Sequence, residues 1–122
     1  MRVLVCGDRN WLNKNLVMEK LKSLSSQVEV VIEGEARGAD TFGRICAQEL
    51  GIPVEKYPAD WKRHGLLAGP IRNVLMLKVG KPDLVLAFHN NIEESKGTGH
   101  MIKIARKAGV KVIVVTEEDR NE

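Results

Sequence analysis

The sequence has little of the residues that mark several specialised classes of protein. Its 122 residues include two cysteines, four prolines and three histidines, and only 4% are aromatic. Two cysteines give no disulfide framework, so we expect buried thiols at Cys6 and Cys46. No apolar run approaches the roughly 18 residues of a membrane span, and Val3 to Cys6 is too short for a signal-peptide core. These absences predict a cytoplasmic protein with no membrane partner.

Charge of one sign is not in large excess either. There are 19 Lys and Arg against 16 Asp and Glu, a net charge of +3, and the charges are interspersed. This excess is too small to indicate nucleic acid as a partner. A content of 43% hydrophobic and 29% charged residues is typical of a folded globule. We predict one domain over residues 1–116 and a short acidic tail over 117–122.

Apolar runs of strand length alternate with segments of helical period along the chain. In one such segment Met101, Ile104, Ala105 and Ala108 lie at i, i+3, i+4 and i+7. This alternation predicts an α/β domain with a five-stranded, mainly parallel sheet and helices on both faces. The predicted strands are Arg2–Cys6, Val28–Glu33, Val54–Tyr57, Leu84–Phe88 and Val112–Val115.

The loops that leave the carboxyl ends of parallel strands line a common crevice, so function is expected there. In this chain those loops are 7–11, 34–40, 58–73 and 89–99, and they hold both tryptophans and seven of the eleven glycines. Their charges are mixed: with Glu33 at the end of the second strand included, there are six cations and seven acids. A polynucleotide groove would be basic throughout, so we expect a small phosphorylated ligand.

Two of these loops are glycine-rich helix entries. In Ser95 to Gly99, free backbone N–H groups, the Ser95 and Thr98 hydroxyls and Lys96 can hold a phosphate, although a simple turn with Thr98 as helix cap fits equally well. In Gly34 to Asp40, Arg37 can make a bidentate phosphate contact, or it is a solvated loop cation. Asp40 is expected to cap the following helix.

Three further side chains are candidate ligand contacts. Arg72 lies at helical spacing from apolar residues, which favours a guanidinium that emerges at the crevice near Asn73, the alternative being a side chain extended along the helix surface. Trp11 and Trp61 lie in polar loops, where each can stack on a nucleobase or plug an end of the sheet. The three histidines are far apart in sequence and lack ligand spacing, so neither a metal site nor a cofactor is expected.

Seven segments in chain order resemble the YspA, cpYpsA-related SLOG family. The resemblance implies a Rossmann-like sheet of order 3-2-1-4-5, a nucleotide pocket at the strand ends and a homo-oligomer, as a dimer or tetramer. The segments are Gly7-x-Arg9-x-Trp11, Ala36 to Asp40, Tyr57 to Trp61, His64-Gly65, Ala68-Gly69-Pro70-x-Arg72-Asn73, Pro82-Asp83 with Ala87-Phe88, and Ser95 to Thr98.

The wider superfamily leaves three functions open for this chain. The resemblance implies nucleotide binding in a sensor or processing role, N-glycoside cleavage as in cytokinin-activating phosphoribohydrolases, or single-stranded DNA binding as in the DNA-processing protein DprA. Phosphoribohydrolases carry a Gly-Gly-x-Gly-Thr-x-x-Glu motif, and Met101 stands where their catalytic glutamate would be. Hydrolysis would then need another carboxylate from Asp60, Glu33, Glu35 and Asp40, with His64 or His89 as proton donor.

Our candidate sites follow from these motifs. The candidate catalytic residues are Asp60, His64 and Glu33. The candidate ligand-binding residues are Gly7, Arg9, Trp11, Gly34, Arg37, Gly38, Asp40, Asp60, Trp61, Arg72, Asn73, His89, Ser95, Lys96, Gly97 and Thr98.

Overall fold

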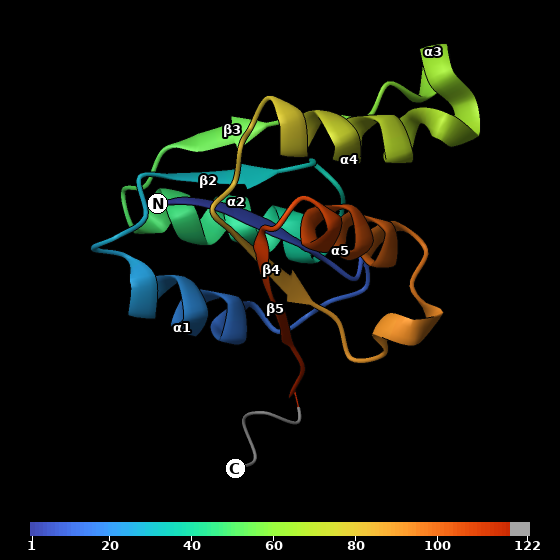
Figure 1. Ribbon diagram of the computed structural model, residues 1–122. Coiled ribbons are helices and arrows are strands. Elements are labelled where there is room, and N and C mark those ends of the chain that lie inside the picture. The colour runs from blue at the N-terminus through green and yellow to red at the C-terminus, as the bar shows by residue number, and fades with distance from the viewer. Residues whose placement is uncertain (118–122) are drawn as a thin grey trace.

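A computed structural model describes residues 1–117, so all but the first residue of the predicted tail lies outside the described residues. Strands and helices alternate, with two helices between β3 and β4 (Figure 1). Short 3-10 turns at Gly65–Leu67 and Ile92–Glu94 precede α4 and α5. The elements are β1 (Arg2–Gly7), α1 (Lys14–Leu24), β2 (Val30–Glu33), α2 (Ala39–Glu49), β3 (Val54–Lys56), α3 (Trp61–His64), α4 (Ala68–Lys78), β4 (Leu84–Phe88), α5 (Gly97–Lys107) and β5 (Lys111–Val115).

The five strands form one parallel sheet in the order β3-β2-β1-β4-β5. The strands β2 and β4 are buried at every position, as expected of strands covered on both faces. Every neighbouring pair of strands runs parallel, and β1 pairs with β4 from Val3↔Leu84 to Gly7↔Phe88. The predicted α/β fold class and strand order are therefore confirmed.

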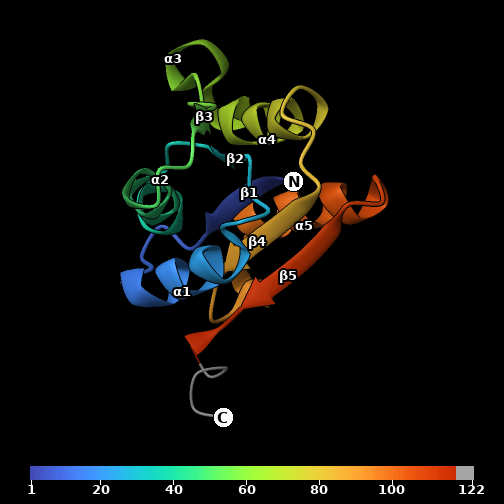
Figure 2. The ribbon, with the colours of Figure 1, turned by 90° about the vertical axis from the view of Figure 1, so that its left-hand side faces the viewer.

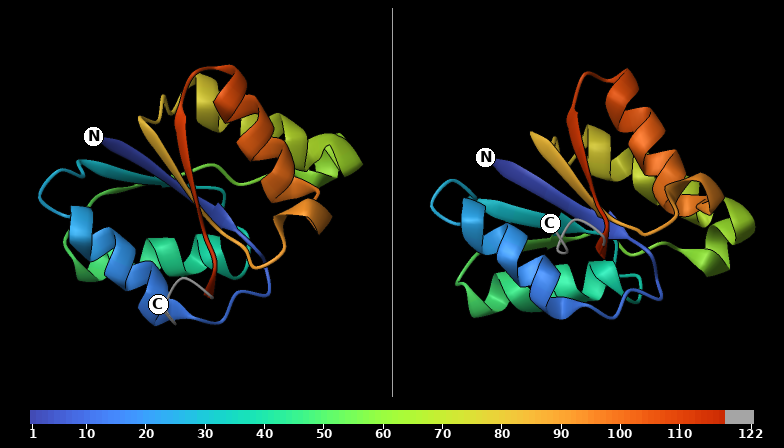
Figure 3. Two further views of the ribbon diagram at one scale, coloured as in Figure 1. Left: turned by 60° about the horizontal axis from the view of Figure 1, so that its bottom comes forward. Right: turned by 90° about the horizontal axis from the view of Figure 1, so that it is seen from below.

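Two hydrophobic cores lie on opposite faces of the sheet. Along β1, Val3 and Val5 face the core that contains α1 and α2, whereas Leu4 and Cys6 face the core that contains α4 and α5. Figures 2 and 3 show this division, with α1 and α2 on one side of the sheet and α4 and α5 on the other. Both cysteines are buried free thiols, as predicted. Among the helices of residues 1–117, none is long and apolar enough to cross a bilayer.

Close backbone approaches fix the loops that follow β1 and β2. A Cβ atom on Gly7 would lie 2.2 Å from the carbonyl oxygen of Phe88. Gly38 has φ +72°, and a Cβ atom there would lie 2.3 Å from the carbonyl oxygen of Asp8. The same oxygen accepts a hydrogen bond from the Ala39 N–H at 3.2 Å. The first turn of α2 is thereby held against the loop after β1, which only glycine allows at these two positions.

Some predicted strand boundaries are wrong, and the pairing between neighbouring strands explains why. The second strand begins at Val30 instead of Val28, because its partner β1 begins at Arg2, which pairs with Val30. The third strand ends at Lys56, which pairs with the last residue of β2, Glu33. Asp60 accepts a hydrogen bond from the Arg63 N–H at 3.1 Å and so begins α3, a short helix that the sequence pattern did not predict.

Candidate functional site

Two adjoining cavities open at the carboxyl ends of the strands. The inner cavity has a volume of about 310 Å³, and the outer cavity has a volume of about 710 Å³. Both volumes fall in the range of small-molecule sites, roughly 300–1,000 Å³. Six residues line both cavities, and we call them the junction: Arg9, Ala36, Arg72, Asn73, Lys96 and Gly97.

Two consecutive residues of α4 hold the junction together. The Arg72 guanidinium donates from Nη1 to the Gly34 carbonyl oxygen at 2.5 Å and from Nε to the Asn73 Oδ1 at 3.0 Å. The Asn73 Nδ2 donates to the Gly97 carbonyl oxygen at 3.2 Å and lies 3.1 Å from the His100 Nδ1. Asn73 is buried, so these bonds are shielded from competing water. The loop after β2 is thus tied to the first turn of α5.

At the beginning of α5, some backbone N–H groups are hydrogen-bonded and others are not. The Ser95 Oγ accepts from the Thr98 and Gly99 N–H groups at 3.1 and 3.2 Å, so Ser95 and not Thr98 caps the helix. The N–H groups of Lys96 and Gly97 donate to no acceptor within residues 1–117. Both of these residues belong to the junction. Unpaired N–H groups at a helix N-terminus favour an anion.

Four cations line the cavities, and three of them share the junction with these N–H groups. Arg9, Arg72 and Lys96 line both cavities, and Arg37 lines the outer one. Within the described part of the chain none of the four forms an ion pair. Arg72 is therefore a crevice residue, as the sequence favoured, and its guanidinium keeps donors that the two bonds above do not use.

Two buried carboxylates shape the loop after β2. The Asp40 Oδ2 accepts from the Gly34 N–H at 3.1 Å and from the Ala36 N–H at 3.3 Å. The Glu33 Oε1 accepts from the Glu35 N–H between them at 2.8 Å. Asp40 lies in the first turn of α2 but does not cap it, which corrects our expectation. Its carboxyl instead holds the loop that walls both cavities.

Burial dominates the titration of both carboxyls. Desolvation raises the pKa of Glu33 to about 7, against a smaller opposing effect of the bond from the Glu35 N–H. It also raises the pKa of Asp40 to about 6, although two backbone N–H bonds and the nearby Arg72 act in the other direction. The Glu33 Oε2 has no hydrogen-bond partner among the described residues.

The two tryptophans lie in different environments. Trp11 is 3% exposed, its ring centroid is 5.7 Å from that of Phe88, and its Nε1 donates to the Asn13 carbonyl oxygen at 2.9 Å. It lines neither cavity and belongs to the hydrophobic core that contains α1 and α2. Trp61 is 53% exposed and lines the outer cavity together with Pro58 and Pro70. Of the two indoles, Trp61 is the one that a ligand in these cavities can reach.

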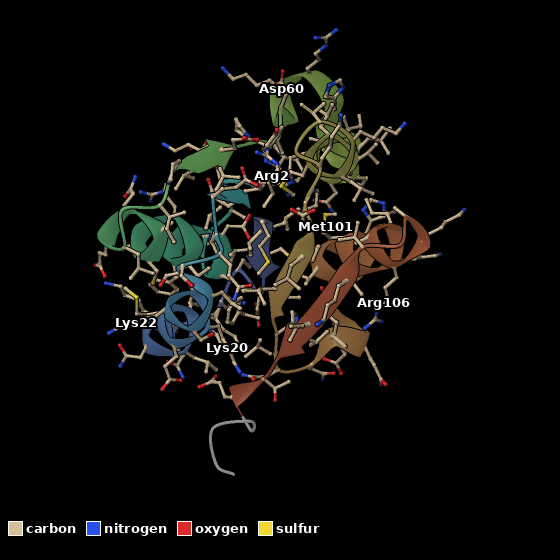
Figure 4. All side chains as sticks on the ribbon, turned by 60° about the vertical axis from the view of Figure 1, so that its left-hand side comes forward. Arg2, Lys20, Lys22, Asp60, Met101 and Arg106 are labelled. Carbon is tan, nitrogen blue, oxygen red and sulfur yellow. The ribbon has the colours of Figure 1, made fainter. Side chains whose placement is uncertain are left out.

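The candidate catalytic residues are not gathered at the cavities. Asp60, His64 and Glu33 line neither of them. Figure 4 shows Asp60 directly before α3 and apart from Met101, which is buried and lines the inner cavity. The acidic residues that do line the inner cavity are Asp8 and Asp40.

Most of the remaining candidates line a cavity. Gly7, His89, Ser95 and Thr98 line the inner one and Gly34 lines the outer one, whereas Gly38 lines neither. The His89 Nδ1 accepts from the Asn91 N–H at 2.9 Å.

Sequence reasoning missed several other lining residues. His100 lies in the outer cavity, and the only available signal was its position one turn after the glycine-rich entry of α5. Cys6 and Met76 lie in the inner cavity, where their apolar side chains gave no signal. Burial raises the pKa of the Cys6 thiol well above its ordinary range, so this cysteine is a poor nucleophile. Residues 1–117 contain no cluster of His, Cys, Asp and Glu that could hold a metal ion.

Comparisons with known proteins connect this crevice to one family. The sequence profile of the YspA, cpYpsA-related SLOG family matches residues 1–64, which run from β1 to the end of α3. The Gene 61 protein of Mycobacterium phage D29 is 37% identical over 120 residues, which cover 92% of this chain and 94% of that protein. No solved structure matches the chain significantly.

The buried Glu33 carboxyl predicts a pH-dependent stability. Its pKa is higher in the folded chain than its ordinary 4.5, so the folded state retains the proton, and the stability from this group declines as pH rises from about 4.5 through 7. A shift of this size corresponds to about 3 kcal/mol. Glu33→Gln keeps an acceptor for the Glu35 N–H and should remove the part of the decline that Glu33 causes, while the part that Asp40 causes up to about pH 6 stays in both proteins. Urea denaturation of parent and variant between pH 4.5 and 8 measures the difference.

The control is Glu94→Gln, which removes an exposed carboxylate from the 3-10 turn before α5. Its unfolding free energy should follow the parent curve across the same pH range. A Glu33→Gln curve that also runs parallel to the parent would mean that Glu33 is ionised inside the folded protein.

Proposed function

Because the chain belongs to the YspA, cpYpsA-related SLOG family, we propose that it binds a nucleotide or nucleotide-derived ligand in the crevice formed by the two cavities. Family membership suggests nucleotide-related binding or processing. We propose that residues 1–116 act as one SLOG-like binding domain in the cytoplasm, in a sensor or processing role. The observation that carries the proposal is the pair of unpaired N–H groups at Lys96 and Gly97 beside three cations.

A phosphate group is the anion that this seat fits best. Backbone N–H groups at the positive end of α5 supply fixed donors, and the guanidinium groups of Arg9 and Arg72 can add parallel pairs of donors. The Gly97 position is open, since a Cβ atom there would meet nothing within 4 Å. A phosphate can therefore approach the backbone without a steric obstacle.

The outer cavity supplies a surface for the base. Trp61 presents a half-exposed indole there, and Pro58 and Pro70 provide further flat apolar contact. An aromatic face that stacks on a base contributes about 1–3 kcal/mol. We assign the base to the outer cavity and the phosphate to the junction.

Two substitutions test this assignment by isothermal titration with a panel of nucleoside mono- and diphosphates. Lys96→Ala removes a charged donor at the junction and should weaken binding about tenfold, since a bond to a charged group contributes about 1.5–3 kcal/mol. Trp61→Ala should weaken binding by a factor of about five or more through the loss of stacking. The matched control is Lys62→Ala, an exposed α3 lysine that lines neither cavity. Absence of binding for the whole panel contradicts the proposal.

A second candidate function is hydrolysis of the N-glycosidic bond of a nucleoside monophosphate. It is favoured by the Asp40 carboxyl, which lines the inner cavity and whose burial raises its pKa to about 6. Such a group is mostly ionised at neutral pH and can stabilise an oxocarbenium-like centre. Met101 lies in the same cavity at the position of the glutamate in the phosphoribohydrolase motif, so Asp40 would have to supply the carboxylate that Met101 lacks.

Incubation with nucleoside monophosphates, followed by chromatography of the free base, tests the hydrolytic function. If the protein is a hydrolase, Asp40→Asn should reduce base release by at least about 100-fold, in line with the size of general acid–base effects. Asp60→Asn serves as the control because Asp60 lines neither cavity, and it should retain activity. Release of no base from any nucleotide leaves the binding function alone.

We further propose that the protein forms a homo-oligomer through α4 and the 3-10 turn before it. Leu66 and Leu67 of this turn are 94% and 65% exposed, Leu75 of α4 is 47% exposed, and Val79, directly after α4, is 60% exposed. Leu66 also lines the outer cavity, so this apolar face adjoins the crevice. Several large exposed apolar side chains along one segment favour an interaction surface.

Light scattering of the purified protein tests the assembly. We expect a dimer or tetramer, and Leu67→Glu should shift it toward the monomer because a charge in an apolar interface is costly. Leu12→Glu is the control, since Leu12 is 86% exposed in the loop before α1, away from this face. A parent protein that is monomeric at all concentrations contradicts the proposal.

A further inference from the structure

We propose that the ligand is a nucleoside diphosphate that carries a second, hydroxyl-rich group, with its base in the outer cavity, its diphosphate at the junction and its second group in the inner cavity. The inference rests on the proposed function and narrows the class of ligand. It follows from where the anion seat lies relative to the two cavities.

The anion seat lies between the cavities and not at the far end of either. The unpaired N–H groups belong to Lys96 and Gly97, which line both cavities. The next two N–H groups, those of Thr98 and Gly99, already donate to the Ser95 Oγ. The helix end therefore offers its free donors at the junction, and Arg9 and Arg72 supply positive charge at the same place.

The inner cavity suits hydroxyl groups better than a phosphate. Asp8 and Asp40 line it, and carboxylates repel a phosphate but accept hydrogen bonds from sugar hydroxyls. The Thr98 side chain also lines it, and its hydroxyl makes no hydrogen bond to another residue in the described chain. The buried thioethers of Met76 and Met101 add an apolar surface for a sugar ring.

The order in which base, sugar and phosphate are joined in a nucleotide then decides what fills the inner cavity. In a nucleoside monophosphate or diphosphate the phosphate is the terminal group, so a base beside Trp61 and a phosphate at the junction leave the inner cavity empty. A ligand that continues beyond its phosphates can occupy both cavities at once. A sugar joined to the terminal phosphate satisfies the acceptors of the inner cavity.

Matched pairs of probes separate this inference from the proposed function. We would titrate the full chain with ADP and ADP-ribose, UDP and UDP-glucose, and GDP and GDP-mannose. For at least one pair the sugar-bearing member should bind about ten times more tightly than the free diphosphate. Equal affinities within each pair would overturn the inference while the proposed function stands. No binding by any probe would overturn both.

Variants show whether the higher affinity of the sugar-bearing probes arises in the inner cavity. Thr98→Val and Asp40→Asn should each reduce the ratio of the two affinities toward one. Thr98→Val preserves the shape of the side chain, so it keeps the test informative if Asp40→Asn impairs folding. Trp61→Ala should weaken both members alike and keep the ratio. Lys103→Ala, on the exposed surface of α5, is the control and should change neither affinity. Equal weakening of both members by Thr98→Val would place a phosphate in the inner cavity and overturn the inference.

Discussion

The crevice depends on one pair of adjacent side chains, Arg72 and Asn73, which join three segments that are distant in sequence. Arg72 bonds to the Gly34 carbonyl in the loop after β2, and Asn73 bonds to the Gly97 carbonyl at the start of α5. The Arg72 Nε also donates to the Asn73 Oδ1, so the two side chains orient each other. Side chains locked in this way make a site preformed, which lowers the entropic cost of binding a ligand.

The same loop is also held by two carboxylates whose charged forms are destabilised by burial. Glu33 and Asp40 accept all three N–H groups from Gly34 to Ala36, although burial raises the pKa of both carboxyls. A buried acid that is not fully paired costs stability at neutral pH. Such costs are typical of functional sites, where geometry is maintained at the expense of stability. The arrangement leaves the cations of the junction without carboxylate partners within residues 1–117.

Sequence patterns predicted the fold well because its signals are local and repeated. Buried strands such as β4 read as unbroken apolar runs, and Gly51 and Gly109 have the positive φ expected of glycines at helix ends. The position of the crevice also followed, since parallel strands bring the same loops together in any such sheet. The details of the site did not follow, because they depend on tertiary contacts. Nothing local distinguishes Trp11 from Trp61, or shows that Asn73 meets His100.

The central claim is that the Lys96 and Gly97 N–H groups hold the phosphate of a nucleotide. Amide NMR of the ¹⁵N-labelled chain tests it most directly, because each N–H reports on its own hydrogen bond. On addition of a nucleotide that binds, the Lys96 and Gly97 signals should shift downfield, and those of Thr98 and Gly99 should move less, since Ser95 already accepts their hydrogen bonds. Saturation by the nucleotide with no shift at Lys96 or Gly97 would contradict the account.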